Sequence, residues 1–228
     1  MDHLLDNPVW NALVTGNKNL AEGNEQVKCF PKEIAPFTGL PQTDQNSFSL
    51  LSAFIPAGRT IAIVAKEQIE IPADWKTINL LNVFQMLNET GSMQDVDLSD
   101  VLPLNTQHVP QMLALTKLTN PGPFFNRTIE FGNYYGIFRD NKLVAITGQR
   151  MHPGHYLEVS AVCTQPGYNG NGYAGKLMKH VSNLIRQQSC IPFLHVLTEN
   201  TGAIKLYNAL GFVTRRQMIV HVIQKKTE

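Results

Sequence analysis

Three glycines stand close together in the segment QPGYNGNGYAGKLM, which begins at Gln165. Gly170 and Gly172 flank Asn171, and Gly175 lies where an apolar pattern of helical spacing begins. Glycine destabilises a helix, so its use here predicts a backbone that another group approaches closely. The first N–H groups of a helix lack internal partners and favour anions. We interpret the segment as a pyrophosphate site, and the alternative is a helix entered through a flexible turn.

Two other phosphate motifs compete for the same residues. The glycines satisfy the G-x-G-x-x-G pattern of dinucleotide-binding folds, with Glu199 near the end of the next predicted strand. Those folds repeat β-α-β units around the motif, whereas an antiparallel hairpin is predicted before it here. A P-loop needs Ser or Thr after Gly-Lys, and Leu177 occupies that place. An NAD-dependent oxidoreductase is therefore a less favoured alternative.

Short apolar and β-branched runs alternate with one-sided helical patterns around this segment. The turn Asp140-Asn141 predicts an antiparallel hairpin, and Gly211 predicts a helix C-terminus. The order predicts a mixed α/β domain, antiparallel first and then with one β-α-β crossover. The predicted strands are 101–104, the two arms of the hairpin 134–151, 156–164, 192–197 and 218–224. The predicted helices are 105–118, 174–185 and 200–212.

The first part of the chain gives fewer signals. Residues 60–66 predict a strand, and apolar residues at helical spacing predict a helix over 77–89. Residues 90–100 are small, polar and acidic without a period, which predicts a linker. We therefore expect an N-terminal α/β region, 1–94, and a second region, 95–228, that contains the glycine segment.

Composition excludes several partners. The chain has 228 residues, a net charge of +1 and 43% hydrophobic residues, which is typical of a globular protein. A nearly neutral balance predicts no nucleic-acid or anionic-membrane partner, and no apolar run is long enough to span a bilayer. The three scattered cysteines and the absence of a signal-peptide pattern predict a cytoplasmic location.

Two blocks carry a family resemblance: VCTQPGYNGNGYAGKLM and FLHVLTENTGAIKLYNALGF. In this order and spacing they resemble the GNAT superfamily of acyl-CoA-dependent N-acyltransferases, in the branch called FR47-like. The resemblance covers roughly 101–223. It implies a mixed, mostly antiparallel twisted sheet flanked by helices, with acetyl-CoA as co-substrate and no metal. In this branch an N-terminal half is often a degenerate copy of the fold.

The resemblance also implies cofactor contacts. The family pattern R/Q-x-x-G-x-G/A begins at Asn169, where arginine or glutamine is usual, so phosphate contact is left to backbone amides. The strand 156–164 is implied to contact the pantetheine arm where it splays from the strand 193–197. The implied cofactor contacts are Val162, Cys163, Thr164, Asn169, Gly170, Asn171, Gly172, Tyr173, Ala174, Gly175, Asn200, Ala203 and Tyr207.

Acetyl transfer to an amine needs a base, a group that polarises the thioester carbonyl and an acid for the leaving thiolate. The resemblance implies Tyr207 as the acid and a backbone N–H near Val162 as the polarising group. We expect Glu158 as the base, because it alternates with Tyr156, Ser160 and Val162 on one strand face. Tyr207 could instead only pack, and Glu158 could lie on a solvated sheet edge.

Other residues give weaker signals. Cys163 lies among apolar residues without a basic neighbour, so a buried hydrophobe is favoured over a nucleophile. His152 and His155 lie in a loop with Pro153, which disfavours a metal site. Asn200 could be an N-cap. The loop 120–125 could shape the pocket of a small-molecule or peptide amine, or be only a turn. A CoA-binding module without turnover remains a further alternative.

Overall fold

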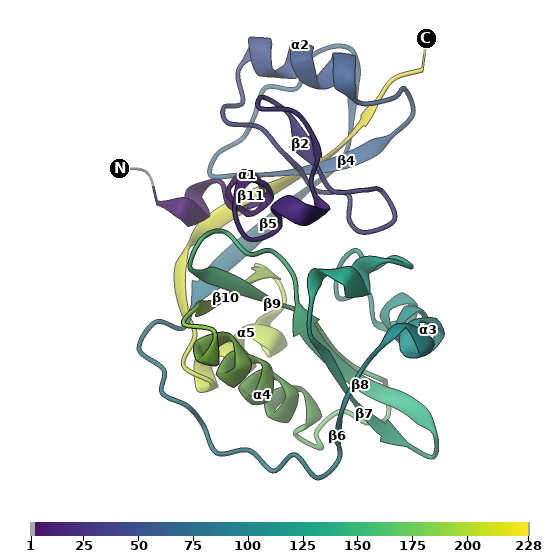
Figure 1. Ribbon diagram of the computed structural model, residues 1–228, viewed down its shortest axis with the longest axis vertical. Helices are drawn as coiled ribbons and strands as arrows, with labels where there is room; N and C mark the ends of the chain where they lie inside the picture. The colour runs from purple at the N-terminus through teal and green to yellow at the C-terminus, as the bar shows by residue number, and fades with distance from the viewer. Residues whose placement is uncertain (1–2, 228) are drawn as a thin grey trace.

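The computed structural model describes residues 3–227, and a large twisted sheet forms its centre (Figure 1). This sheet has eight strands in the order β4-β11-β5-β10-β9-β8-β7-β6. Its strands are β4 (Thr60–Ala65), β5 (Trp75–Leu87), β6 (Val101–Pro103), β7 (Tyr134–Arg139), β8 (Lys142–Gln149), β9 (Tyr156–Thr164), β10 (Ile191–Leu197) and β11 (Val213–Lys225). A small sheet contains β1 (Glu22–Gly23), β2 (Lys28–Cys29) and β3 (Thr38–Gly39).

The predicted fold class is confirmed. Within residues 3–227, β9 and β10 pair in parallel, and all other neighbours in the large sheet pair antiparallel. The parallel ladder covers only the start of β9, from Tyr156↔Ile191 to Glu158↔Phe193. Beyond Glu158, β9 pairs only with β8 and β10 pairs only with β5. A gap therefore opens in the middle of the sheet, between the later parts of β9 and β10.

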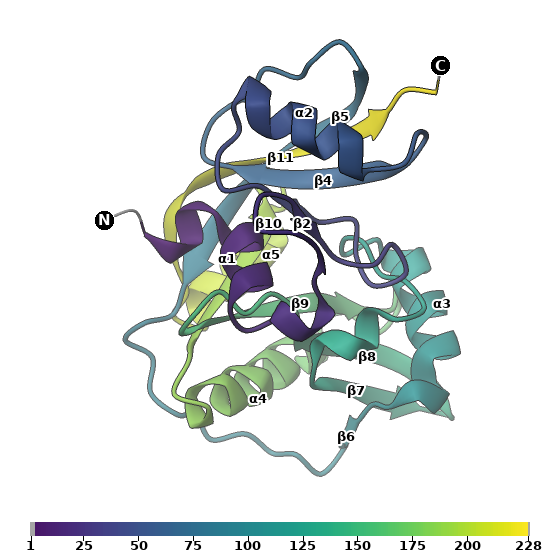
Figure 2. The same cartoon turned by 45° about the horizontal axis from the view of Figure 1, so that its top comes forward.

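Helices cover both faces of the sheet (Figure 2). The helix α4 (Tyr173–Gln187) and α5 (Thr201–Ala209) share a core with Leu157 and Val159 of β9. The opposite face carries α1 (Pro8–Val14), which shares a core with Tyr156, and α3 (Val109–Thr119), which packs on Cys163. The helix α2 (Gln45–Phe54) packs on β4 and β11, in the upper part of Figure 1. Short 3-10 helices lie at Leu4–Asp6, Lys18–Leu20, Thr106–His108 and Thr128–Phe131.

The predicted helix over 77–89 is wrong, because these residues belong to the long central strand β5. Leu80, which would lie on the buried face of such a helix, is 40% exposed. The strand pairs with β11 on one side and with β10 on the other. Sheet pairing along both edges overrides a local apolar spacing that happens to match a helical period. The strand predicted at 60–66 is confirmed as β4.

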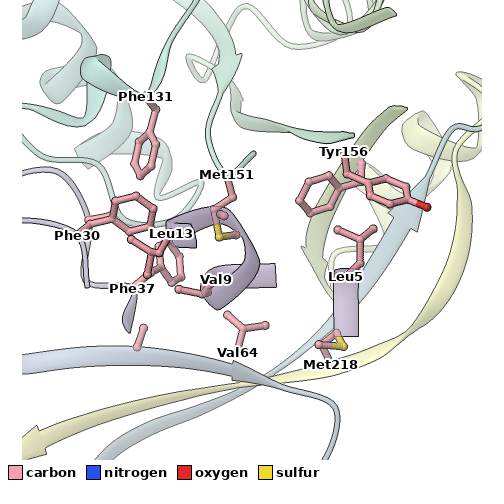
Figure 3. Packing of buried hydrophobic residues seen from close by; sticks show 14 of the residues in the cluster. Leu5, Val9, Leu13, Phe30, Phe37, Val64, Phe131, Met151, Tyr156 and Met218 are labelled. Atoms are coloured by element: carbon pink, nitrogen blue, oxygen red, sulfur yellow. The ribbon is translucent and has the colours of Figure 1, made fainter. Parts of the chain in front are cut away.

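A hydrophobic cluster joins the N-terminal segments to the rest of the chain (Figure 3). Leu5, Val9 and Leu13 come from the N-terminal helices. Met151 comes from the connection between β8 and β9, and Tyr156 from the start of β9. The expected boundary at 94/95 falls between β5 and β6, yet β5 lies between β10 and β11 in the same sheet. The sheet and the core thus both extend across this boundary. The division of the chain into two regions at 94/95 stays a prediction.

Candidate functional site

A bulge interrupts β9 beside the gap in the sheet. Ala161 has φ of +53°, a left-handed conformation that costs a non-glycine residue about 1–3 kcal/mol. The pairing of β9 with β8 shifts at the same point, between the pairs Ser160↔Gly148 and Cys163↔Ile146. A bulge redirects the strand and leaves one residue out of the ladder. The surrounding fold therefore holds strained backbone at the edge of the gap.

The bulge turns backbone groups toward the gap. Before it, Glu158 donates its N–H to Met151 on the β8 side, and after it Gln165 donates to Val144 of β8. The backbone N–H and C=O groups of even-numbered residues thus point toward β8 before the bulge. After the bulge, those of odd-numbered residues point toward β8. By this alternation the N–H and C=O groups of Val162 and Thr164 are directed away from β8, toward the side where β10 has diverged. Both were predicted contacts of a pantetheine arm.

The glycine loop lies directly after β9. Gly170 and Gly172 have φ of +84° and +75°, which side-chain-bearing residues adopt only with strain. A Cβ at either position would meet no atom within 4 Å, so the space over the loop is open. Gly172 is the N-cap of α4, and no side chain caps this helix end. The free amides and open space fit a diphosphate, which supplies charge but requires close approach.

Positive side chains near the loop are already paired. Lys176, in the first turn of α4, lies 2.8 Å from Asp100 and 3.3 Å from Asp97. Arg139 also pairs with Asp100, at 2.5 Å, and donates a hydrogen bond to the hydroxyl of Tyr173 at 3.1 Å. The segment that carries these aspartates runs past the outer side of α4 (Figure 1). Main-chain amides are therefore the principal unneutralised donors around residues 169–175.

Tyr207 lies on α5, in a core against which Val162 of β9 also packs. Its side chain is 7% exposed and belongs to the core between the helices and β9. Burial, together with the nearby Cys163 thiol, raises the pKa of Tyr207 to about 12. The phenol is therefore protonated at neutral pH and able to donate. The Asn200 side chain accepts a hydrogen bond from the Ala203 amide at 3.1 Å, which confirms the N-cap at the start of α5.

Glu158 lies at the last position where β9 pairs with β10, and it is fully buried. Its carboxylate accepts two hydrogen bonds from Arg150, each 2.7 Å long. His195 of β10 contacts the same carboxylate through Nδ1 at 2.8 Å, and its Nε2 lies 3.1 Å from the amide nitrogen of Gln85. Burial alone would raise the pKa of Glu158, but the Arg150 charge and these hydrogen bonds outweigh it and lower the pKa to about 2. Such a carboxylate accepts a proton poorly at neutral pH.

The lowered pKa makes a prediction about stability. A carboxyl with a folded-state pKa of about 2 and an ordinary value of 4.5 contributes stability above pH 4.5 and loses it as the pH falls toward 2. We expect Glu158→Gln to be destabilised relative to the natural chain at pH 7, and the difference to shrink steadily below pH 4.5. Urea unfolding at a series of pH values measures this difference. A difference that is constant from pH 7 to 3 would contradict the ion pair.

The bulge also separates residues that simple alternation places together. Tyr156, Glu158 and Ser160 share a face as predicted, but Val162 packs with the α4 and α5 core on the opposite face. Cys163 is buried against α3, and burial raises the pKa of its thiol to about 11, which favours the buried-hydrophobe interpretation.

Within residues 3–227, no group of three His, Cys, Asp or Glu side chains is placed to hold a metal.

Arg150 and His195 were not predicted from the sequence. A signal was present, because Arg150 and Glu158 are opposite charges at facing ends of two predicted antiparallel strands. A second signal was His195, a polar residue within the otherwise apolar predicted strand 192–197. Neither feature can be recognised without knowing the turn between the strands, which fixes their register.

Comparisons with known proteins agree with this geometry. The family model described as FR47-like protein matches residues 134–220. A crystal structure from Novosphingobium aromaticivorans, described as an acetyltransferase from the GNAT family, is 32% identical, with a TM-score of 0.92 over 99% of this chain and 100% of that one. A GCN5-related N-acetyltransferase from Kribbella flavida shares the fold at 10% identity, with a TM-score of 0.64 over 96% of this chain and 95% of that one. No curated protein matches the sequence.

The strand gap, the bulge and the uncapped helix after a glycine loop define an acyltransferase fold. This chain belongs to the GNAT family, in its FR47-like branch. The mostly antiparallel sheet leaves no place for the repeated parallel units of a dinucleotide-binding fold. Among the helices of residues 3–227, none combines the length and apolar character needed to cross a bilayer.

Proposed function

We propose that the protein transfers an acetyl group from acetyl-CoA directly to a primary amine of a small molecule or peptide. The observation that carries this proposal is that the glycine loop follows directly after the part of β9 that has separated from β10 and carries the bulge. The amides of residues 169–175 would hold the diphosphate, and Val162 and Thr164 would hold the pantetheine arm. Asn200, Ala203 and Tyr207, at the start and middle of α5, would border the same molecule.

Each chemical step has a candidate group on this chain. The Val162 N–H would stabilise the negative charge that develops on the acyl oxygen as the amine nitrogen bonds to the acyl carbon. As the carbon–sulfur bond breaks, the Tyr207 hydroxyl would donate its proton to the departing thiolate. The amine loses one proton to solvent, and solvent restores the proton of Tyr207. No metal is needed for any of these steps.

Glu158 keeps a place in this proposal through the side chains it holds. With a pKa of about 2 and both oxygens occupied, it is a weak direct base. We propose that it acts as a positioning residue, which fixes Arg150 on one side and His195 on the other. The proton that the amine loses therefore goes to solvent and not to Glu158.

A screen for thiol release tests the proposed function. Free amino acids, polyamines and peptides with free N-termini are each incubated with the protein and acetyl-CoA. At least one class should release thiol in proportion to protein concentration and yield an acetylated amine. A thermal-shift comparison accompanies the screen, and acetyl-CoA should raise the unfolding midpoint while NAD should not.

The screen also separates the proposal from its main alternative. A CoA-binding module without turnover would show the acetyl-CoA thermal shift but no thiol release with any amine. The departure from the family pattern at Asn169 and the weak basicity of Glu158 both favour this alternative. The three cysteines are free, which supports a proposed location in a reducing cytoplasm.

A further inference from the structure

A second opening lies on the other face of the sheet, beside the bulge. It is a shallow hollow open to solvent, with a cavity volume of about 10 Å³ that admits one small group, between the loop 121–124 and the strands β7 to β9. Its lining includes Arg150, Ser160, Ala161, Tyr134 and Phe124. Ala161 separates this pocket from the Val162 N–H by a single peptide unit. A molecule in the pocket would therefore reach the gap from the face opposite α4.

Tyr134 supplies an unsatisfied polar group in this pocket. Its side chain is 2% exposed, and its hydroxyl has no hydrogen-bond partner among the described residues. The ring is held edge-on against Phe124, with centroids 5.7 Å apart. Leaving a buried hydroxyl unpaired costs about 1–3 kcal/mol, so such a group in a native pocket indicates a missing partner.

Arg150 supplies unused donors in the same place. Glu158 takes one edge of the guanidinium, through Nε and one hydrogen of Nη2, and Phe37 covers one face at 4.8 Å. A guanidinium has five N–H donors, so three remain, and none of them has a partner within residues 3–227. The side chain is 12% exposed, which leaves it in contact with the pocket.

The number of donors decides which ligand fits. Arg150, Tyr134 and Ser160 all line this one small pocket, and together they carry three guanidinium N–H groups and two hydroxyls without a partner among the described residues. An amide or ketone oxygen has two lone pairs and would leave most of these donors unsatisfied. A carboxylate offers about four acceptor sites and matches a guanidinium edge.

We propose that this pocket binds a carboxylate of the amine acceptor, so that the substrates are amino acids or short peptides that carry a nearby carboxylate. The inference rests on the proposed function and deepens it. Residues 160 and 162 are at most roughly 7 Å apart along an extended strand, a separation that an amino acid or a dipeptide can span between its carboxylate and its amine.

Paired acceptors test the proposal by kinetics. Each amino acid or dipeptide is compared with its own C-terminal amide, which differs only in lacking the charge. We expect kcat/KM to be at least about tenfold higher for the carboxylate member. Tyr134→Phe should reduce this ratio several-fold through KM of the carboxylate acceptor, and Tyr135→Phe, on the other face of the same strand, should leave the ratio unchanged. Equal use of acid and amide by the natural chain would overturn the proposal.

A binding measurement keeps this test apart from the test of acetyl transfer. Calorimetry with N-acetyl amino acids and their amides, in the presence of CoA, requires no turnover. Selective binding of the acids that is weakened in Tyr134→Phe would support the carboxylate site even if no amine releases thiol. Thiol release with neutral amines, without any preference for acids in either measurement, would leave the proposed function intact and remove this inference. Tyr134→Phe deletes an unpaired hydroxyl, so the variant is expected to fold.

Discussion

Tyr207→Phe should lower kcat by roughly 100-fold or more while leaving the affinity for acetyl-CoA within about a factor of three. The phenol is buried in the core that Val162 of β9 packs against, and with a pKa of about 12 it is protonated at neutral pH. Removing its proton leaves the departing thiolate without a nearby acid, whereas the ring still packs in the α5 core. Steady-state kinetics with saturating amine measures kcat, and calorimetry measures the affinity for acetyl-CoA.

Tyr135→Phe is the matched control for this experiment. Tyr135 packs edge-on against His180 of α4 and has no proposed role in proton transfer, so its loss should leave kcat close to that of the natural chain. Thermal unfolding of both variants shows whether a loss of rate reflects a loss of folded protein. If Tyr207→Phe retains kcat within about threefold, the hydroxyl is not the acid and the tyrosine only packs.

Arg150→Met should destabilise the fold by about 3–5 kcal/mol at neutral pH, because it leaves the Glu158 carboxylate buried without its main partner. His195 would remain, with a single contact to the carboxylate. Urea unfolding gives the free energy of unfolding directly. The loss should be smaller at low pH, where Glu158 becomes protonated without cost to the fold.

Two further variants show whether the loss comes from the isolated charge. Arg150→Met combined with Glu158→Leu should recover most of the stability, because a well-packed apolar pair can replace a buried ion pair. Arg127→Met breaks the exposed pair with Glu130 and should cause little change. Equal effects of Arg150→Met and Arg127→Met would contradict the described environment of Glu158.

The sequence predicts the C-terminal part of the fold well, because its signals are local. Strands and helices from β6 to β11 lie close to their predicted residues, since short apolar runs, the Asp140-Asn141 turn and the Gly211 helix end depend on neighbouring residues. Asp140 and Asn141 both have positive φ, as a tight hairpin turn requires. The sequence predicts a helix where β5 lies, because the neighbours that make this segment a strand, β10 and β11, are formed by residues far along the chain.

In the candidate site, too, features made by neighbouring residues could be predicted, and features made by distant residues could not. The glycine loop could be identified because the residues that bind and the residues that shape the backbone are the same ones. The environment of Glu158 could not, since Arg150 and His195 contact its carboxylate from two different strands or strand ends, and Gln85 of a third strand contacts His195. The bulge at Ala161 also has no sequence signal, because alanine rarely adopts a positive φ and does so here only under the constraint of the sheet.

The affinity of acetyl-CoA for Gly172→Ala, compared with Gly58→Ala, tests the central claim most directly. The two glycines have nearly equal φ, +75° and +76°, and a Cβ at either has room, so the strain that alanine introduces is matched. Gly172 lies at the uncapped start of α4, whereas Gly58 lies near the C-terminal end of β11. If backbone amides of the loop hold the diphosphate, Gly172→Ala weakens acetyl-CoA binding by about tenfold or more and Gly58→Ala does not. Equal affinities in the two variants would show that the coenzyme binds elsewhere.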